Sequence, residues 1–296
     1  MGWARRLAPG QSCRVRVADA ATGEVRTVHI DRSVLLEAPN WSRAGDLVLN
    51  GDGVLWRLAA DASGGLEQIA IEQLPELNND HVLAPDGETV YLSANDGNIY
   101  AAPIAGGTAA RITRAPDDRY HFLHGVRPDG ERLAYVSLHL DAGWQSAVVR
   151  TVGVDGEEDA PVTVPPGPDD GPEYSPDGAW IYFNTERFST VPGHAQIARV
   201  RPDGTGIEQL TFDERVNWFP HVSPDGTRAV HLSFPPGTEG HPADLPVQLK
   251  VIAEGRWSEP AVVLDVFGGQ GTINVNSWSP DGAFFAFVDY PMEGQQ

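Results

Sequence analysis

The 296-residue chain contains one cysteine, one lysine and two methionines, and it has no long apolar run. Cys13 has no second cysteine to pair with, which excludes a fold held together by internal disulfides. Lys250 is the sole lysine, and no basic cluster with interleaved aromatic residues is present, so we expect no nucleic acid partner. No apolar run approaches the length of a membrane span, so we also expect no membrane insertion.

The N-terminal segment, residues 1–7, carries two arginines but no apolar stretch of seven residues or more. A secretory signal requires such a stretch, so we expect a cytoplasmic protein. The whole chain has 41 acidic and 21 basic side chains, which gives a formal charge of −20. The electrostatic field of this negative charge would repel a long polyanion and attract divalent cations. We nevertheless assign most of the acidic residues to the solvated surface.

Glycine and proline, by contrast, are abundant, with 32 and 24 residues, and many of them belong to a repeated Pro-Asp-Gly turn. In this turn proline fixes φ, aspartate bonds its own backbone and glycine accepts a positive φ, so the chain reverses between two strands. Copies stand at residues 85–87, 128–130, 176–178, 224–226 and 280–282, with a degenerate copy at 41–45. The spacing runs from 42 residues, between residues 43 and 85, to 56 residues, between 224 and 280, which is room for the four strands of a propeller blade.

Six such turns predict an all-β fold, a six-bladed β-propeller that forms a single domain over residues 1–296. The final turn is followed by one strand only, residues 283–290, so the last blade is incomplete. Residues 14–18 and 26–30 precede the first repeat and have the pattern of the missing strands. We therefore expect the N-terminal strands to complete the C-terminal blade and close the ring. The predicted blades span approximately residues 34–75, 78–115, 120–165, 170–212, 216–266, and 272–290 together with 12–31.

Residues at equal distances before each turn occupy equivalent places on the innermost strands, which line the central channel. Three and four residues before the turn proline, polar side chains replace apolar ones. The long loop 235–246, which contains His241 and Asp244, could fold over the channel mouth, and a role as a plain connector fits it equally well. Four of the nine histidines lie in or just before the polar window, and they are His81, His121, His124 and His221. We expect a pocket where the inner strands enter the channel.

Imidazoles and a carboxylate from different blades form a donor set suited to a divalent metal ion, with Zn, Mn and Ca as the candidates. We predict His81, His124 and His221 as the ligands of a metal that acts as a Lewis acid or activates water. Glu173, as acid or base, and His121 are the predicted catalytic residues. The predicted contacts to a small, sugar-like substrate are Asn79, Asp170, Asn217, Trp218, Gln270 and Arg187.

Two observations leave an alternative open for these histidines. An inner-strand imidazole can simply bond a backbone group of a neighbouring strand. In addition, His81 and His124 lie four residues before the turn proline, whereas Glu173 and His221 lie three residues before it. In regular strands these two positions face opposite sides, so only a bulge or the twist of an inner strand would bring the side chains together.

Three arginines, Arg111, Arg114 and Arg119, lie close together, between the end of the predicted second blade and the start of the third. Such guanidinium groups can bind a substrate carboxylate through paired hydrogen bonds. Solvation at the surface also accounts for them, and it is the interpretation we favour from sequence.

The repeat Tyr174-Ser175-Pro176-Asp177-Gly178, followed by the alternating strand 180–183, resembles the repeat of TolB-like β-propellers, and the resemblance extends over nearly the whole chain. The segments that look like a bacterial branch consisting of the propeller alone are 78–81, 169–173, 217–221 and 267–275. A TolB-like protein would be expected to bind protein partners.

The repeats are also similar to those of oligogalacturonate lyases, propellers whose channel holds a metal site of His and Gln that serves β-elimination on uronates. That similarity would make His81, His124 and His221 metal ligands here, with Gln270 as a further candidate. The resulting prediction is a metal-dependent, carbohydrate-active enzyme with its site at the channel mouth, a lyase first and a hydrolase second. The alternative is a non-catalytic TolB-like scaffold that presents its loops to another protein.

Overall fold

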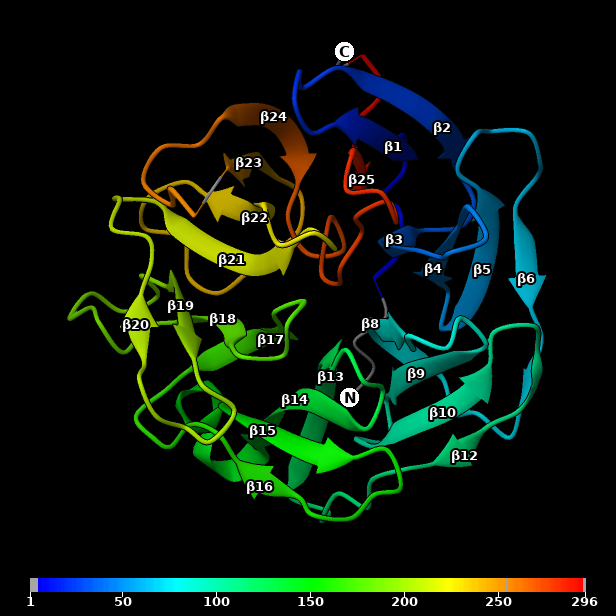
Figure 1. The fold of residues 1–296 in the computed structure, drawn as a ribbon. Helices are drawn as coiled ribbons and strands as arrows, with labels where there is room; N and C mark the ends of the chain where they lie inside the picture. Colours follow the sequence, from blue (N-terminus) through cyan, green and yellow to red (C-terminus); the bar gives the residue numbers. More distant parts are fainter. Residues whose placement is uncertain (1–4, 254, 295–296) are drawn as a thin grey trace.

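Six β-sheets surround a central channel in the computed structural model, which describes residues 5–253 and 255–294. The sheets follow one another around the ring in chain order, as the colours of Figure 1 show. This arrangement confirms the predicted six-bladed β-propeller. The helices of the described residues are two 3-10 turns, η1 (Leu140–Ala142) and η2 (Trp144–Ser146), and neither is long enough to cross a membrane.

Within blades one to five the strands pair in chain order from the innermost to the outermost. Blade one consists of β3 (Leu36–Trp41), β4 (Asp46–Gly51), β5 (Val54–Ala59) and β6 (Glu67–Ile69). Blade two consists of β8 (Leu77–Leu83), β9 (Thr89–Ala94), β10 (Ile99–Pro103) and β12 (Ala110–Arg111). A short parallel pair, β7 (Ile71–Glu72) and β11 (Gly107–Thr108), lies beside them.

The next three blades repeat this order. Blade three consists of β13 (Arg119–Val126), β14 (Arg132–His139), β15 (Val148–Gly153) and β16 (Ala160–Pro161). Blade four consists of β17 (Asp169–Tyr174), β18 (Ile181–Thr185), β19 (Gln196–Val200) and β20 (Glu208–Gln209). Blade five consists of β21 (Val216–Val222), β22 (Arg228–Phe234), β23 (Leu245–Ala253) and β24 (Val262–Gly268).

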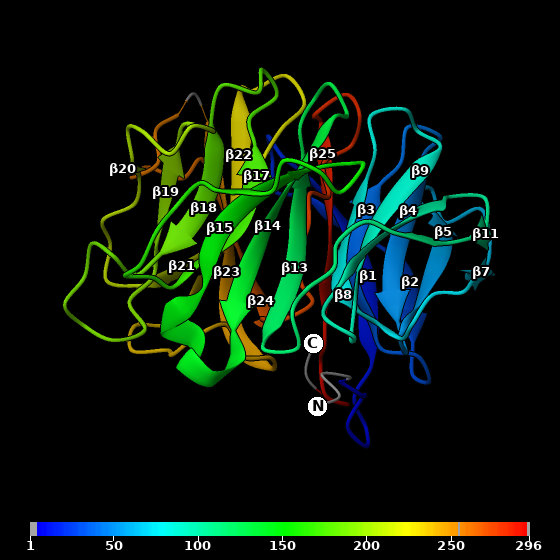
Figure 2. The same cartoon turned by 90° about the horizontal axis from the view of Figure 1, so that it is seen from below.

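The two ends of the chain build the sixth blade together. Here β25 (Phe284–Asp289) pairs with β1 (Cys13–Asp19), and β1 pairs in turn with β2 (Val25–Asp31). In place of a longer inner strand, Trp278 forms an isolated bridge to Phe285. The closure predicted from the sequence is therefore confirmed. Figure 2 shows that the described segments nearest the two termini, which are bridged at Gln11 and Met292, lie on one face of the ring.

A buried ion pair fastens this closure. Asp289 on β25 accepts two hydrogen bonds from the guanidinium group of Arg14, at 2.8 and 2.6 Å, and one from Arg16 at 3.1 Å. The side chain of Asp289 is only 2% exposed, and both arginines lie on β1. The strand-to-strand hydrogen bonds are thus supplemented by a charge-assisted bidentate contact.

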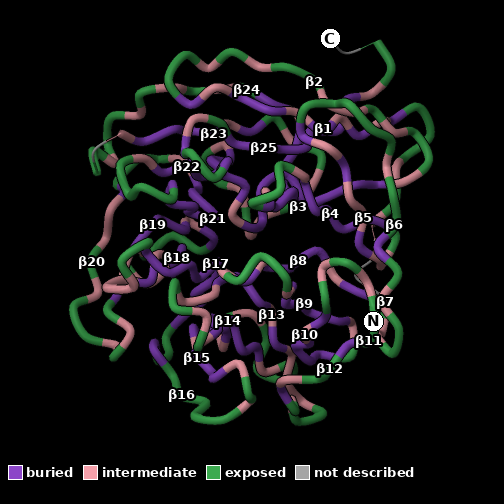
Figure 3. The backbone as a smooth tube through the Cα atoms, turned by 45° about the vertical axis from the view of Figure 1, so that its right-hand side comes forward, coloured by how far each residue is buried: buried purple, intermediate pink, exposed green. Residues whose placement is uncertain are grey.

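The repeated turns have the geometry that their residues dictate. In the third blade, Asp129 Oδ1 accepts the backbone N–H of Glu131 at 3.0 Å, and Gly130 has a φ of 79°. The other turn glycines also have positive φ values. The chain reverses at every copy of the turn, and apolar side chains of neighbouring blades pack together between the sheets. Figure 3 shows the buried backbone on the inner strands and the exposed backbone in the connecting loops.

The inner strands of blades one to five each contain a bulge, visible as a shift in register. Five residues before the turn, Ala38, Gly171 and Phe219 take left-handed conformations, with φ values of 51°, 62° and 52°. Because a bulge interrupts the alternation of the strand, positions three and four before the turn no longer face strictly opposite sides. This feature allows the side chains of His124 and His221 to reach neighbouring inner strands.

Candidate functional site

His124, on the inner strand β13, lies at the centre of a buried polar group near the channel mouth. Its Nδ1 is 3.2 Å from the carbonyl oxygen of Asn274, and its Nε2 is 3.2 Å from Asp170 Oδ1. A carbonyl oxygen can only accept, so Nδ1 carries a proton. Since β13 belongs to blade three and Asp170 to blade four, the contacts of His124 connect side chains far apart in the sequence.

The two carboxylates that interact with His124 have pKa values shifted in opposite directions. Burial alone would lower the pKa of His124, but Asp80 and Asp170 outweigh it and raise that pKa to about 9. Burial and the charge of Asp170 raise the pKa of Asp80 to about 6. Hydrogen bonding and charge from His124 outweigh burial at Asp170, whose pKa is lowered. Environments that separate the pKa values of two nearby acids are typical of acid–base sites.

Aromatic side chains and one loop cover this group. His241, from the loop before β23, bonds Gln270 Oε1 through its Nδ1, and its Nε2 is 3.7 Å from Asp170 Oδ2. The His241 ring lies 4.4 Å from the ring of Trp218, which in turn stacks on Trp144 at 6.5 Å. Through His241 this loop contacts the buried polar group.

An arginine from the N-terminal segment also enters the site. Arg5 donates from Nη1 to Glu37 Oε1 at 2.8 Å and to the carbonyl oxygen of Gln270 at 2.5 Å. Its guanidinium group lies 4.5 Å from the centre of the Tyr290 ring. Burial outweighs the charge of Arg5 at Glu37 and raises the pKa of that carboxyl to about 7. Arg5 thus joins blade one to the segment before blade six.

Glu173 and His221 form a separate pair. His221 Nδ1 is 2.6 Å from Glu173 Oε2, and His221 Nε2 donates to the carbonyl oxygen of Ile273 at 2.5 Å. Glu173 Oε1 accepts the backbone N–H of Val222 at 2.9 Å and the amide of Asn276 at 2.8 Å. These bonds connect blades four, five and six, so the geometry gives the pair a bracing role. Its catalytic and metal-binding assignments stay predictions.

His81 and His121 lie in other surroundings. His81 Nε2 is 3.2 Å from the carbonyl oxygen of Val48 in blade one, and burial lowers the pKa of His81 to about 4. The simpler alternative from sequence, a bond to a neighbouring backbone group, therefore describes His81. His121 lines a pocket between blades two and three, apart from Glu173, and burial lowers its pKa to about 4 as well.

Some of the predicted substrate-binding residues lie together at the channel mouth, and the others have different surroundings. Asp170, Gln270 and Trp218 meet around His241 at the mouth. Trp218 is fully buried, and its ring packs against those of Trp144 and His241. Asn217 and Arg187 are engaged by other residues, since Asn217 donates to Asp213 at 2.9 Å and Arg187 forms an ion pair with Asp169. Asn79 is buried on β8.

The predicted metal ligands do not converge. His81 faces a carbonyl oxygen, and His124 faces a carbonyl oxygen and the carboxylate of Asp170. His221 also faces a carbonyl oxygen and a carboxylate, but they belong to Ile273 and Glu173. In the described part of the chain, no group of three or more His, Cys, Asp or Glu side chains is placed to hold a metal ion. The donor set present does not fit a divalent metal, because His124 and His221 use both ring nitrogens for internal partners. Among these three rings, only the buried Nδ1 of His81 has no partner in the described part of the chain.

Several residues of the mouth were not singled out as site residues by the sequence. Asp80 lies just before the polar window and directly precedes His81, so its position in the sequence could have identified it as a site residue. Glu37 belongs to the degenerate first repeat, where the register is hardest to assign. Trp144 and Arg5 lie outside the inner strands altogether, so the repeat pattern gives no information about them.

The raised pKa of His124 has a consequence for stability. A histidine whose folded-state pKa is raised stabilises the fold below its unfolded value of about 6.5, and this contribution is lost as the pH rises through about 9. We expect the difference in unfolding free energy between the parent and His124→Gln to shrink by about 2–3 kcal/mol over this interval. Urea denaturation across the interval measures it.

The control for that measurement is His139→Gln, because His139 Nε2 pairs with the exposed Asp118 at 3.0 Å outside the channel. This variant should follow the pH dependence of the parent. A parallel pH dependence of the parent and His124→Gln would contradict the assigned protonation of His124.

Comparison with known proteins places this geometry in a family. No family model matches the chain. It is 36% identical over 293 residues to the uncharacterised protein Atu1656 of Agrobacterium fabrum (strain C58 / ATCC 33970), with 96% of each chain covered. It also matches a solved structure from Agrobacterium tumefaciens, provisionally named TolB, with a TM-score of 0.85 and 35% identity over 95% of this chain and 99% of that one.

An oligogalacturonate lyase in complex with manganese matches with a TM-score of 0.58 and 14% identity, over 90% of this chain and 75% of the lyase. At that identity the likeness extends to the fold alone. Because the two Agrobacterium proteins are matched at more than a third identity over almost their full length, the chain belongs to the family of TolB-like six-bladed β-propellers.

Proposed function

We propose that the protein binds a small, sugar-like molecule at the channel mouth and acts on it through acid–base chemistry of Asp80, His124 and Asp170. The observation that carries this proposal is the hydrogen-bonded contact of His124 with Asp170 at 3.2 Å, together with the charge interaction of Asp80 with the same imidazole. The pKa of Asp80 is raised and that of Asp170 is lowered. A carboxylic acid with a raised pKa can give a proton, while its ionised neighbour can take one or stabilise a cation.

The aromatic cover supports a carbohydrate-like ligand. Trp144 is partly exposed and stacks on the buried Trp218, so we infer that the exposed part of its indole contacts the hydrophobic side of a sugar ring. The imidazole of His241 and the amide of Gln270 stand beside it and can bond hydroxyl groups. Admission of a ligand to Asp170 requires the contact between His241 and Gln270 to open.

The charge of the mouth favours hydrolysis over the elimination that ranks first from the sequence. Elimination on a uronate needs cations to bind the substrate carboxylate. Here three carboxylates, Glu37, Asp80 and Asp170, face two cations, Arg5 and His124, and the cations are already paired. A neutral sugar suits this environment better than an acidic one. No step is assigned to a metal, since the imidazoles of the mouth have internal partners.

Binding can be tested by intrinsic fluorescence and calorimetry with a panel of neutral oligosaccharides. We expect Trp144→Ala to weaken binding at least tenfold because the stacking face is lost. The matched control is Trp180→Ala in blade four, where the indole lies under Arg199 and Arg201 and away from the mouth. Equal weakening by both variants, or no binding to the parent, would reject the proposed site.

Catalysis on a bound sugar can then be measured as release of reducing ends. We expect Asp80→Asn to lower kcat by about a hundredfold or more with little change in KM, which is the usual cost of losing a general acid. Asp129→Asn, in an exposed turn, should leave kcat unchanged. Activity that EDTA abolishes and Mn²⁺ restores would overturn the metal-free chemistry and favour the metal site predicted from sequence.

The non-catalytic alternative has one specific observation in its favour. Phe188, Val191 and Phe212 are 43%, 58% and 70% exposed, and their segments are joined by a 3.0 Å contact from His194 Nε2 to the carbonyl oxygen of Asp213. Exposed apolar side chains that lie together are typical of protein-binding surfaces. A scaffold role requires that Asp80→Asn leave every activity of the protein unchanged, so the same variant separates the two functions.

A further inference from the structure

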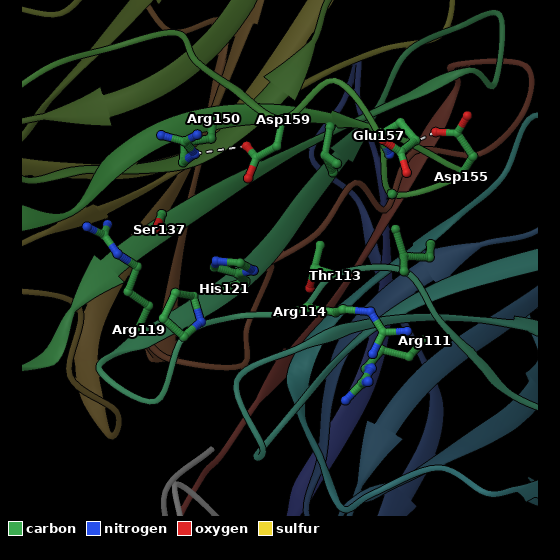
Figure 4. A pocket seen from close by; sticks show the side chains of 14 residues that line it. Arg111, Thr113, Arg114, Arg119, His121, Ser137, Arg150, Asp155, Glu157 and Asp159 are labelled. Atoms are coloured by element: carbon green, nitrogen blue, oxygen red, sulfur yellow. Dashed lines mark hydrogen bonds and ion pairs between the residues drawn. The ribbon is translucent and has the colours of Figure 1, made fainter.

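A second site lies away from the channel mouth, between blades two and three. This pocket has a volume of about 610 Å³ and is drawn in Figure 4. Residues 111–119, which lead from β12 to β13, form one side, and β14, β15 and residues 155–159 form the other. Its size is within the range of pockets that bind small molecules.

Four of the 21 basic residues of the chain line this pocket, in a protein whose formal charge is −20. Arg150 is paired with Asp159 at 2.9 Å. The other three are Arg111, Arg114 and Arg119. Across residues 5–253 and 255–294, no carboxylate lies within ion-pair distance of these three side chains. A local excess of unpaired guanidinium groups is the feature that an anionic ligand requires.

A buried neutral imidazole completes the lining. His121 is 5% exposed, and its ring centre lies 4.7 Å from that of Tyr135 in a tilted arrangement. Its Nδ1 has no hydrogen-bond partner in the described part of the chain. Figure 4 shows its ring between the arginine at the start of β13 and the Arg150–Asp159 pair. A buried polar side chain without a partner is costly unless a ligand or water satisfies it.

We propose that this pocket binds a small oxyanion ligand, one that carries two or more carboxylate or phosphate groups. Arg111 and Arg114 contribute exposed guanidinium forks, and Arg119 and His121 contribute donors on the inner side. The three acidic residues of the lining limit the ligand to a compact one, because Asp155, Glu157 and Asp159 would repel a long polyanion. The site is independent of the function proposed for the channel mouth.

Calorimetry at low ionic strength tests this inference, with pyrophosphate and citrate as the two probes. We expect the parent to bind at least one probe, and the double variant Arg111→Ala/Arg114→Ala to bind it at least tenfold more weakly. The matched control is Arg199→Ala/Arg201→Ala, which removes two arginines of blade four that stack on Trp180. This control should bind within twofold of the parent, and preference for one probe assigns the phosphate or carboxylate class.

A second readout is the imidazole NMR signal of His121, identified by its absence in His121→Phe. We expect this signal to move on titration of the parent with the bound probe and to stay in place in the Arg111→Ala/Arg114→Ala variant. Absence of binding by both probes would overturn the proposal. Equal weakening in the blade-four control, or binding that leaves the His121 signal in place, would overturn it as well.

Discussion

Glu173→Ala is expected to lower the free energy of unfolding by about 3–5 kcal/mol. The carboxylate is buried and accepts bonds from His221, from the backbone of Val222 and from Asn276. Removing it leaves His221 Nδ1 and the backbone N–H of Val222 without this partner, whereas Asn276 keeps its bond to the carbonyl oxygen of Val222. Three blades then lose a common contact. Urea denaturation monitored by circular dichroism measures the loss. Glu131→Ala, at an exposed position, should change the stability by less than about 0.5 kcal/mol.

The conservative variant separates a bracing role from a catalytic one. In Glu173→Gln the new amide oxygen can still accept from Val222 and Asn276, while its NH₂ group can donate to His221 Nδ1. His221 Nε2 can continue to donate to the carbonyl oxygen of Ile273. We expect a loss of less than about 1.5 kcal/mol. A stable Glu173→Gln protein whose activity is abolished would establish the catalytic role predicted from the sequence, whereas a loss as large as in Glu173→Ala would contradict this hydrogen-bond scheme.

Asp289→Ala is the second substitution with a large expected effect. It removes the acceptor of the bidentate contact from Arg14 and of the bond from Arg16, and so loosens β25 from β1. Because each arginine remains about one-quarter exposed and can regain water, we expect a loss of about 2–4 kcal/mol. Amide hydrogen exchange should also accelerate first in β1 and β2, which depend on this closure.

A matched control is Glu208→Ala on the outer strand of blade four. Its ion pair with Arg199 is similarly short, at 2.7 Å, but the Glu208 carboxylate is 48% exposed, whereas that of Asp289 is 2% exposed. We expect a change below about 1 kcal/mol. If Asp289→Ala were no more damaging than Glu208→Ala, the closure would depend on backbone pairing and apolar packing alone.

The fold was predictable from the sequence because its information is local and repeated. Each repeated Pro-Asp-Gly turn marks the position where a hairpin reverses, and the number of these turns, with the degenerate copy included, gives the number of blades. The closure could be predicted because only one strand follows the last turn, so strands from elsewhere in the chain had to complete the sixth blade. A further Pro-Asp-Gly turn, at residues 202–204, is out of phase with this repeat and joins β19 to β20.

The site was less predictable because its partners come from different blades. The repeat places His81, His124 and His221 on inner strands, but it does not say which carbonyl or carboxylate each ring meets. A bulge in the strand changes the direction of a side chain without a clear mark in the sequence, as the left-handed Ala38 and Phe219 illustrate. Residues equivalent in the repeat therefore have different surroundings.

The shared last blade has a consequence for synthesis of the protein. β1 leaves the ribosome early, but its neighbour β25 begins 265 residues later, from Asp19 to Phe284. At about 5–20 residues per second, the nascent chain carries β1 without that neighbour for roughly 15 to 50 s. During this time Cys13, Val15 and Val17, which are fully buried or nearly so in the finished ring, lack part of their cover. A polypeptide released prematurely, before residue 284, would retain this open edge permanently and become a natural target for chaperones and proteases.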